Sequence, residues 1–406
     1  MKAVKIMSIA LALVLCLGML AGLVSCGEKN YAANNTKVKI GLTGPLTGGA
    51  AIYGVAVKNA ATLAVAEINE ASKKEGGLGL EFELVMLDDK HDATSVENLY
   101  ANLYEQGMQI SLGTVTTKPG LEFKNFSGED NVFFLTPSAT GDDITKDYDN
   151  GYQMCFSDSN QGTAAADIFN ANYKGKSVGI FYKADDEYSK GIYDNFKKNL
   201  DSSFKDVKEA TFTGDASTFD SQINILKDCE IVFMPIYYTP ASQFMTQAKN
   251  VANKIEIYYG CDGFDGIDAI EGFDINEVSQ QVSYVSHFNS NAQDGPAKEF
   301  IDKYNTSKLF DAKKEPLNQF GAAAYDCVWA IYEALKVAKA NGESFDATTS
   351  ANDYCEILKA VFNSDDFVYH GITGECKDGA KSNISWNADG TVDKMPITYD
   401  VKKKTN

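Results

Sequence analysis

The stretch KVKIGLTGPLTGGAAIYGVAVKNAATLAVAEIN, residues 37–69, predicts the fold of the chain. It opens with an apolar-rich run, residues 38–42, of the kind that forms a strand buried on both faces. A loop follows over residues 43–49, where glycine and proline disfavour both helix and strand. Apolar residues then recur at three- and four-residue spacing from Val55 to Ile68, which predicts a helix. This is the first half of a βαβ unit, and ligands of parallel sheets bind where its loop would lie.

Two interpretations of this loop compete. A phosphate cradle would need a Gly-x-Gly-x-x-Gly pattern or a Gly-Lys-Ser/Thr sequence, and the loop has neither. The lip of a solute-binding cleft fits better, with Tyr53 as an aromatic residue at the start of the helix. From the loop alone, a Tyr53 that packs the loop and contacts no ligand is the favoured interpretation.

The rest of the chain repeats this alternation of strands and helices, which indicates parallel, doubly wound sheets. The alternation runs to residue 136 and starts again near residue 162, so that we expect two similar lobes joined by several crossovers. Expected strands are 80–87, 110–113, 132–136, 177–182, 207–212, 231–234, 255–259 and 281–287. Expected helices are 96–106, 121–126, 162–173, 188–200, 217–226, 240–251, 295–304, 319–340 and 355–362. Residues 382–386 and 395–399 are expected to form a hairpin around Asn387–Gly390.

The length of 406 residues suits two domains, and the net charge of −19 argues against binding to nucleic acid, whose phosphates would be repelled. We expect lobe 1 to comprise residues 37–156 and 288–385, and lobe 2 to comprise residues 157–287 and 386–406. An acidic surface is usually only solubilising, so the charge does not predict a cationic ligand.

The N-terminus is typical of an export signal, with Lys2 and Lys5 before an apolar run that reaches residue 24. Residues 23–26, Leu-Val-Ser-Cys, resemble a bacterial lipobox. We therefore expect residues 1–25 to be a signal peptide and Cys26 to be lipidated, which would hold the protein at the outer face of a membrane. The alternative is an incidental cysteine in an uncleaved anchor. Residues 26–36 should form the anchored, flexible tether, because they are too polar and too few to fold.

The remaining cysteines show no metal-binding spacing. The chain has eight cysteines, with no Cys-x-x-Cys pair and no nearby histidine at ligand spacing. Export would permit disulfides, and Cys355 with Cys376 is the pair that we favour. Cys229 and Cys327 lie in apolar runs, which favours buried thiols.

Catalysis is not supported by the sequence. The three histidines lie in unrelated predicted elements, and no nucleophile elbow or zinc-protease motif occurs. His91 follows Asp88-Asp89, which suggests a metal less than it suggests a solvated loop after a strand. We expect no enzyme activity, no metal and no cofactor.

Asp262 follows the predicted strand 255–259, at a carboxyl end that would face the cleft. A carboxylate there can hold an ammonium group by a charge-assisted hydrogen bond. A turn-forming Asp-Gly explains the same residues equally well. A calcium loop does not, because the acids of residues 262–268 are spaced by three and no closing glutamate follows.

The segment 37–69, with Gly-Pro-Leu-Thr-Gly, a Tyr-Gly pair and an Ala-rich helix ending in Glu-Ile-Asn, resembles the start of branched-chain-amino-acid-type solute-binding proteins. These are periplasmic or lipid-anchored receptors of ABC importers, with the type I periplasmic binding protein fold. Residues 260–264, Gly-Cys-Asp-Gly-Phe, resemble the family motif whose acid binds the ligand's α-ammonium group. Residues 135–140, Leu-Thr-Pro-Ser-Ala-Thr, resemble the family loop that holds the α-carboxylate and α-amino group.

The resemblance implies a set of ligand-binding residues in this sequence. Thr116 and Thr117 match a Ser/Thr-rich loop that contacts the carboxylate, and this shorter version leaves the choice between them open. Tyr237, ahead of Tyr238, matches a ligand-contacting tyrosine, and Asp158 and Gln161 match the crossing into lobe 2. The full expected set is Tyr53, Thr116, Thr117, Ser138, Ala139, Thr140, Tyr188, Tyr237, Asp262 and Phe264.

Three departures from the family pattern stand out. Met154-Cys155-Phe156 replaces a segment that usually carries an arginine, an insertion follows Gly374, and Phe264 stands where tryptophan is common. The resemblance still implies a receptor that captures a branched-chain or other apolar amino acid between two lobes and delivers it to an ABC permease. The alternatives are a same-fold receptor for another small ligand, such as an amide or an aromatic acid, and an extracytoplasmic sensor that feeds a membrane kinase.

Overall fold

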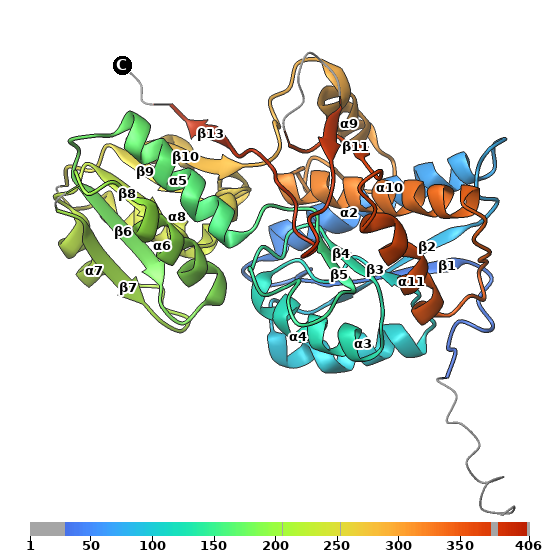
Figure 1. Ribbon diagram of the computed structural model, residues 1–406. Helices are drawn as coiled ribbons and strands as arrows, with labels where there is room; N and C mark the ends of the chain where they lie inside the picture. The colour runs from blue at the N-terminus through green and yellow to red at the C-terminus, as the bar shows by residue number, and fades with distance from the viewer. Residues whose placement is uncertain (1–28, 205, 252, 375–380, 404–406) are drawn as a thin grey trace, which may run out of the picture.

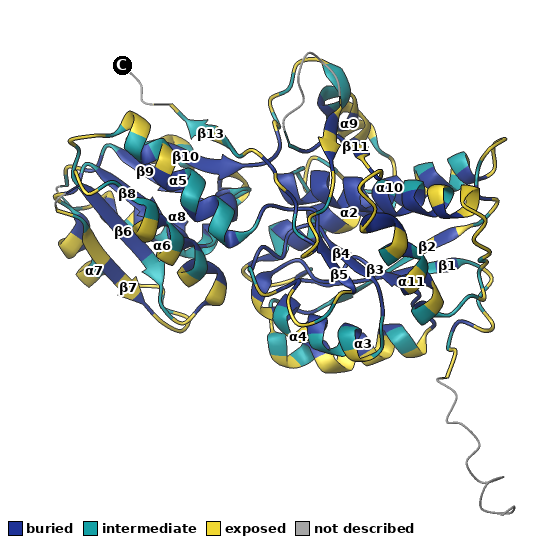
Figure 2. Ribbon diagram, viewed as in Figure 1, coloured by how far each residue is buried: buried dark blue, intermediate teal, exposed yellow. Residues whose placement is uncertain are grey.

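The protein consists of two α/β lobes that lie side by side (Figure 1), in a computed structural model that describes residues 29–204, 206–251, 253–374 and 381–403. Each lobe is built on a mostly parallel sheet, which confirms the fold predicted from the alternation of strands and helices. Figure 2 shows that both sheets are buried and that exposed residues gather on the outer faces of the helices. Apolar strands covered by helices on both faces are typical of parallel sheets.

The sheet of lobe 1 has five parallel strands in the order β2-β1-β3-β4-β5. Helices α2 and α10 pack against each other on one face, and α3 and α4 cover the other (Figure 1). The strands are β1 (Val38–Gly44), β2 (Phe82–Asp88), β3 (Ile110–Ser111), β4 (Phe134–Thr136) and β5 (Gly151–Gln153). The helices are α2 (Ala51–Ser72), the 3-10 turn Ala93–Ser95, α3 (Val96–Glu105), α4 (Thr117–Glu129), α9 (Gly295–Thr306), α10 (Gln319–Ala340) and α11 (Ala351–Phe362).

The sheet of lobe 2 has the order β13-β10-β9-β8-β6-β7, and only β13 is antiparallel to its neighbour. Its strands are β6 (Val178–Lys183), β7 (Lys208–Phe212), β8 (Ile231–Met234), β9 (Ile257–Gly260), β10 (Gln281–Ser286) and β13 (Ile397–Lys402). Its helices are α5 (Asp158–Asn172), α6 (Glu187–Asn199), α7 (Asp220–Leu226), α8 (Tyr238–Ala248) and the 3-10 turns Asp262–Phe264, Ile267–Ala269 and Ile275–Glu277.

By length and composition alone, helix α2 could cross a membrane. In the structure it is a core helix, because it is buried between α10 and the sheet. Its Gly54 allows a close approach to the preceding loop, since a Cβ at this position would lie 2.0 Å from the carbonyl oxygen of Pro45. The Tyr-Gly pair therefore fixes how the loop sits on the start of the helix.

Within the described ranges, three connections join the lobes: between β5 and α5, after β10, and before β13. The predicted boundary after residue 385 needs correction. The indole Nε1 of Trp386 donates to the carbonyl oxygen of Gln153 at 2.8 Å, and the amide of Gln153 donates to the carbonyl oxygen of Gly390 at 2.9 Å. Residues 386–392 thus belong to lobe 1, and the last crossover lies at residues 393–396.

The predicted hairpin of residues 382–386 and 395–399 is wrong. Strand β12 (Ser382–Ile384) pairs with β11 (Tyr369–Gly371), whereas β13 pairs with β10 in the other lobe. The Asn387–Gly390 turn closes only the bridge between Trp386 and Val392. The reason is the Trp386 ring, which packs 4.4 Å from the ring of Phe362 and holds this side of the turn on lobe 1.

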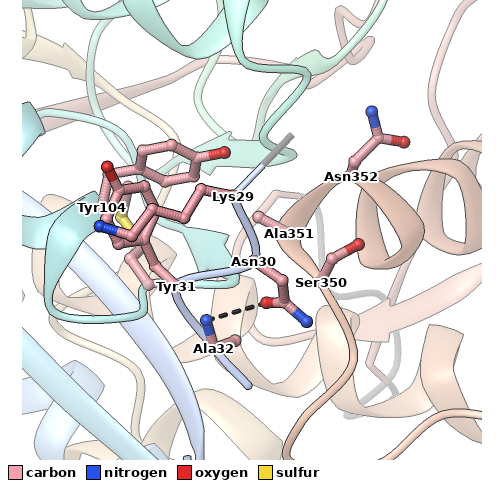
Figure 3. A pocket seen from close by; sticks show the side chains of 9 residues that line it. Lys29, Asn30, Tyr31, Ala32, Tyr104, Ser350, Ala351 and Asn352 are labelled. Atoms are coloured by element: carbon pink, nitrogen blue, oxygen red, sulfur yellow. Dashed lines mark hydrogen bonds between the residues drawn. The ribbon is translucent and has the colours of Figure 1, made fainter. Parts of the chain in front are cut away.

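The prediction of a flexible tether over residues 26–36 is also wrong for residues 29–36, the part that the structure describes. Asn35 Nδ2 donates to the carbonyl oxygen of Gly107 at 2.7 Å, Asn30 Nδ2 donates to that of Thr348 at 3.0 Å, and Ala32 is 2% exposed. Figure 3 shows Lys29–Ala32 beside Tyr104 of α3 and the first residues of α11, around a cavity of about 60 Å³. Asparagine side chains thus fix a segment whose polar composition predicted none of these contacts. The predicted signal peptide and Cys26 lie outside the described residues.

The five cysteines in the described ranges are buried: Cys155, Cys229, Cys261, Cys327 and Cys355. The thiol of Cys355 lies 3.3 Å from Asn131 Oδ1. Cys376, its predicted partner, lies outside the described residues, so this pairing stays a prediction.

Candidate functional site

The carboxyl ends of the two sheets meet at one cavity. Eight of the residues predicted for the site line it: Tyr53, Thr116, Thr117, Ser138, Thr140, Tyr188, Tyr237 and Asp262. Val115, Gly263 and Phe320 complete the lining. Because loops from both lobes contribute, anything bound here would contact both lobes at once.

Lobe 1 supplies hydroxyl groups and a helix N-terminus. Thr116 is the N-cap residue of α4, and no side chain caps the first turn of this helix. Thr117 Oγ1 accepts from the amide of Gly141 at 3.2 Å and lies 3.5 Å from Thr140 Oγ1, and Ser138 Oγ donates to the carbonyl oxygen of Val115 at 2.7 Å. The hydrogens of hydroxyl groups and of first-turn amides carry positive partial charge and can donate to an anion, so this wall suits an anionic group such as a carboxylate.

Lobe 2 supplies the carboxyl group of Asp262, which follows β9. Its Oδ1 accepts a hydrogen bond from the Tyr188 hydroxyl at 2.5 Å, and its amide donates to Gln161 Oε1 at 3.1 Å. Asp262 is 1% exposed, and burial raises the pKa of its carboxyl to about 7. A buried carboxylate of this kind is stabilised by a cationic partner.

A second buried acid, Asp158, begins α5 at the crossover into lobe 2. Its amide donates to the carbonyl oxygen of Thr140 at 2.8 Å, and its Oδ1 has no hydrogen-bond partner among the described residues. Burial, with a further contribution from the Asp262 charge, raises the pKa of Asp158 well above its ordinary value. Of the two acids, Asp262 is the one that lines the cavity and is placed to contact a cation there.

Aromatic rings fill the space between these polar walls. The rings of Tyr188 and Tyr237 stack at 4.6 Å, and the Tyr53 ring lies 4.9 Å from that of Phe320. The cavity that remains measures about 10 Å³, which is room for about one water molecule. An amino-acid-sized molecule can therefore enter only when the lobes separate or these rings move.

Direct contacts hold the lobes together around the cavity. The Tyr53 hydroxyl donates to the carbonyl oxygen of Gly263 at 2.5 Å, and Thr239 Oγ1 donates to that of Gly49 at 2.8 Å. The loop after β1 and the start of α2 thus touch lobe 2 directly. Tyr53 both packs this loop and lines the cavity, so the two interpretations of its role are compatible.

Two predicted residues, Ala139 and Phe264, do not line the cavity. Ala139 is 1% exposed, with its amide donating to Thr136 Oγ1 at 3.0 Å and its carbonyl oxygen accepting from Gln153 Nε2 at 2.8 Å. The Phe264 side chain is fully buried in the core against Gly260, where a Cβ would lie 2.2 Å from its ring. Both side chains therefore belong to the hydrophobic core and not to the cavity wall.

His91, for which the sequence favours a solvated loop over a metal ligand, contacts two residues that line the cavity. Its Nδ1 lies 2.9 Å from Thr116 Oγ1, and its ring stands edge-on to that of Tyr237 at 5.2 Å. Burial, followed by the charge of Lys183, lowers the pKa of His91 to about 4, so the ring is neutral near pH 7. His91 follows the carboxyl end of β2, the neighbour of β1 in the sheet, and this position in the sequence could have predicted that His91 lies at the cleft edge of the sheet.

A metal at Asp88–His91 is not favoured by the geometry. The Asp88 carboxylate accepts from the amide of Leu46 at 2.8 Å and from Thr47 Oγ1 at 2.6 Å, and so fixes the loop after β1. Within the described ranges, no group of three or more His, Cys, Asp or Glu residues is placed to hold a metal ion.

Comparison with known proteins agrees with this architecture. The family model described as periplasmic binding protein matches residues 37–367. The Leu/Ile/Val-binding protein BraC3 of Rhizobium johnstonii is 28% identical over 86% of this chain and 92% of its own.

Two solved structures share the fold. A leucine-binding protein LivK from Thermotoga maritima superposes with a TM-score of 0.73 at 22% identity, over 91% of this chain and 96% of its own. A solute-binding protein of an ABC transporter from R. palustris, in complex with benzoate, also gives a TM-score of 0.73, at 16% identity over 90% and 93%. The family that matches residues 37–367 consists of substrate-binding proteins and not of enzymes. On the extent of that match, the chain belongs to the periplasmic binding protein family.

Proposed function

We propose that the protein is an extracytoplasmic receptor that captures a branched-chain or other apolar amino acid between its lobes and delivers it to an ABC permease. One observation carries this proposal. A single cavity joins the buried carboxyl group of Asp262 in lobe 2 to the hydroxyls of Thr116, Thr117, Ser138 and Thr140 in lobe 1. Those are the two chemistries that a zwitterion needs at its two ends.

In this proposal Asp262 binds the α-ammonium group by a charge-assisted hydrogen bond. The hydroxyls and the start of α4 bind the α-carboxylate. The rings of Tyr53, Tyr188 and Tyr237 enclose the apolar side chain after moving apart to admit it. Ionisation of Asp262 is coupled to binding, since the ammonium group stabilises the charged form.

The three crossovers between the lobes provide the hinge. A ligand whose ends are held by different lobes binds the closed state better than the open state, and it shifts the population accordingly. The permease would recognise the closed form. The relatives named above support this proposal, since BraC3 is a Leu/Ile/Val-binding protein and LivK is a leucine-binding protein.

A ligand without an amine is the second candidate, favoured by the four aromatic rings in the lining and by the benzoate complex of a protein with the same fold. An aromatic acid would place its carboxylate at the lobe 1 hydroxyls and its ring between the tyrosines. It would leave Asp262 without an ionic partner, which is why the amino acid is our first choice.

Thermal unfolding tests the proposal against a panel of leucine, isoleucine, valine, simple amides and aromatic acids including benzoate. A ligand of the folded state raises stability by about 2.7 kcal/mol at 100 times its Kd. We expect the largest rise with one of the three branched-chain amino acids. A rise only with ligands that lack an amine would replace the first candidate by the second, and no rise with any compound would contradict both.

We also propose that the chain is a lipoprotein, from the lipobox-like residues 23–26. Radiolabelled palmitate should be incorporated into the wild-type protein in the native host and not into Cys26→Ser. Equal labelling of the two proteins would rule out this anchor.

A further inference from the structure

A second, larger compartment lies at the mouth of the cleft. It measures about 380 Å³ and is lined from lobe 1 by Gly49, Lys90 and His91 and from lobe 2 by Lys183, Asp215 and Tyr237, among others. We call it the outer compartment. Tyr237 also lines the inner cavity, so this residue borders both spaces.

The outer compartment gathers positive charge on a strongly acidic protein. The chain has a net charge of −19, yet Lys90 and Lys183 approach this space from opposite lobes. Asp215 is the acid in the lining, and the nearest ion-pair partner of Lys183 is Asp185, with Nζ and Oδ1 at 4.0 Å. Burial is the main cause of the lowered pKa of His91; the charges of Lys183 and Lys118 lower it further, and those of Asp92 and Asp215 act in the opposite direction.

The lobe 1 side of the compartment is held in a sparsely populated conformation. Lys90 and His91 have φ values of +54° and +62°, in the left-handed region that side chains other than glycine seldom adopt. The carboxylates of Asp88 and Asp89 hold them there, by accepting from the amides of Lys90 at 3.0 Å and His91 at 2.8 Å. Strain maintained in this way is concentrated at ligand-binding sites.

Closure of the lobes brings the two lysines around one space, and like charges repel each other there. An anion between them would remove this repulsion and would bind the closed state selectively. We propose that the outer compartment is an anion site that bridges the lobes and takes a carboxylate between Lys90 and Lys183. This inference rests on the proposed function: a separate carboxylate leaves the apolar amino acid as the ligand, whereas a distal carboxylate would replace its apolar side chain by an acidic one in the same receptor.

The carboxylate can come from two sources. In the first case, the carboxylate ends the side chain of the bound amino acid, and this side chain passes Tyr237. In the second case, the carboxylate belongs to a separate small molecule. Norleucine and 2-aminoadipate distinguish these, because they have six carbons each and differ only in a terminal methyl or carboxylate. Acetate, added to norleucine, is the probe for the separate anion.

Titration calorimetry on the full protein at low salt gives the test. If the ligand supplies the carboxylate, 2-aminoadipate should bind at least about fivefold more tightly than norleucine, as expected for one or two partly exposed ion pairs. If a separate anion supplies it, 10 mM acetate should tighten norleucine binding by a similar factor, on the order of fivefold. In either case the gain should shrink in about 0.5 M sodium chloride, which screens exposed charges.

Lys90→Met and Lys183→Met should each reduce this gain, and the double variant should abolish it without weakening norleucine binding. Lys190→Met is the matched control, because Lys190 is exposed on α6 and pairs with Asp194. Equal binding of the two amino acids with no effect of acetate would overturn the anion site and leave the proposed function standing. Binding of neither amino acid would overturn the anion site, and the proposed function would fall with it only if leucine, isoleucine and valine also fail to bind.

Discussion

The hydroxyl of Tyr53, on helix α2 of lobe 1, donates a 2.5 Å hydrogen bond to the carbonyl oxygen of Gly263, which follows strand β9 in lobe 2. Tyr53 is 1% exposed, so this bond is shielded from water. It exists only while the lobes are together, because its donor and acceptor belong to different lobes. Tyr53 therefore contributes to the closed state and not only to the fold of its own lobe.

We expect Tyr53→Phe to weaken ligand binding by about tenfold. The substitution leaves the Gly263 carbonyl oxygen buried without its partner, which costs about 1–3 kcal/mol, whereas in the open state water satisfies this oxygen. Tyr304→Phe is the matched control, because the Tyr304 hydroxyl donates to the carbonyl oxygen of Glu315 at 2.9 Å within lobe 1. Calorimetry should show weaker binding for Tyr53→Phe alone, and an equal effect of both variants would show that the bond does not act through closure.

Asp262→Asn should lose most of the affinity for a free amino acid. Removing one partner of a buried charged pair typically costs about 2–5 kcal/mol, which is about thirtyfold or more in affinity. Asp268→Asn is the control, because Asp268 is exposed in the same loop region. Circular dichroism should show both variants folded. Native-like leucine binding by Asp262→Asn would contradict the assignment of the ammonium site.

Ligand binding should strengthen as the pH rises through 7. Burial raises the pKa of Asp262 to about 7 in the folded protein, and an ammonium ligand needs its ionised form. Binding at pH 5.5 should be about thirtyfold weaker than at pH 8, in proportion to the ionised fraction. The ligand-induced rise in Tm should be correspondingly smaller at pH 5.5.

The ligand-free protein should show the opposite trend in stability. A folded-state pKa of about 7 lies above the ordinary value near 3.9, so the stability due to Asp262 is full at low pH and is lost as the pH rises through 7. Asp89 behaves alike, since burial raises its pKa to about 7 as well. To isolate the contribution of Asp262, the Tm is measured against pH for the wild type and for Asp262→Asn. The Tm of the wild type should fall more steeply with rising pH, and equal slopes for the two proteins would contradict the raised pKa of Asp262.

Removal of residues 29–36 should lower the Tm by about 3 °C and leave ligand affinity unchanged. A chain that starts at Lys37 lacks the side-chain hydrogen bonds of Asn30 and Asn35 and the contact between Tyr31 and Tyr104, each of which contributes about 1 kcal/mol. Scanning calorimetry of chains starting at Lys29 and Lys37 provides the comparison. Equal Tm values would mean that this segment adds nothing to lobe 1.

Local pattern predicted most strands and helices because buried parallel strands are apolar runs. Strand β5, Gly151–Gln153, escaped prediction because its three residues form no such run and pairing with β4 defines it. Helix α4 was expected only over residues 121–126 and begins at Thr117, since Pro119 is tolerated in a first turn. The tail hairpin failed because the contacts of Trp386 and β13 are with distant parts of the chain.

The loops that line the cavity were predictable, whereas the direction of each side chain within them was not. In the loop after β4, Ser138 and Thr140 face the cavity and Ala139 does not. In the 3-10 turn after β9, Asp262 faces the cavity and Phe264 enters the core. Phe320, from the start of α10, reaches the site through packing between helices, which no local pattern encodes.

The placement of β13 has a consequence for the biogenesis of the protein. Lobe 2 begins near residue 157, but its sheet is complete only when residues 397–402 pair with β10. Lobe 1 likewise needs α10, which packs on α2 although more than two hundred residues separate the two helices in the sequence. Contacts of such long sequence separation form slowly and leave apolar surface exposed meanwhile. Both lobes can therefore complete their cores only when the ribosome has made almost the whole chain, so that apolar surface of the nascent protein stays uncovered until then.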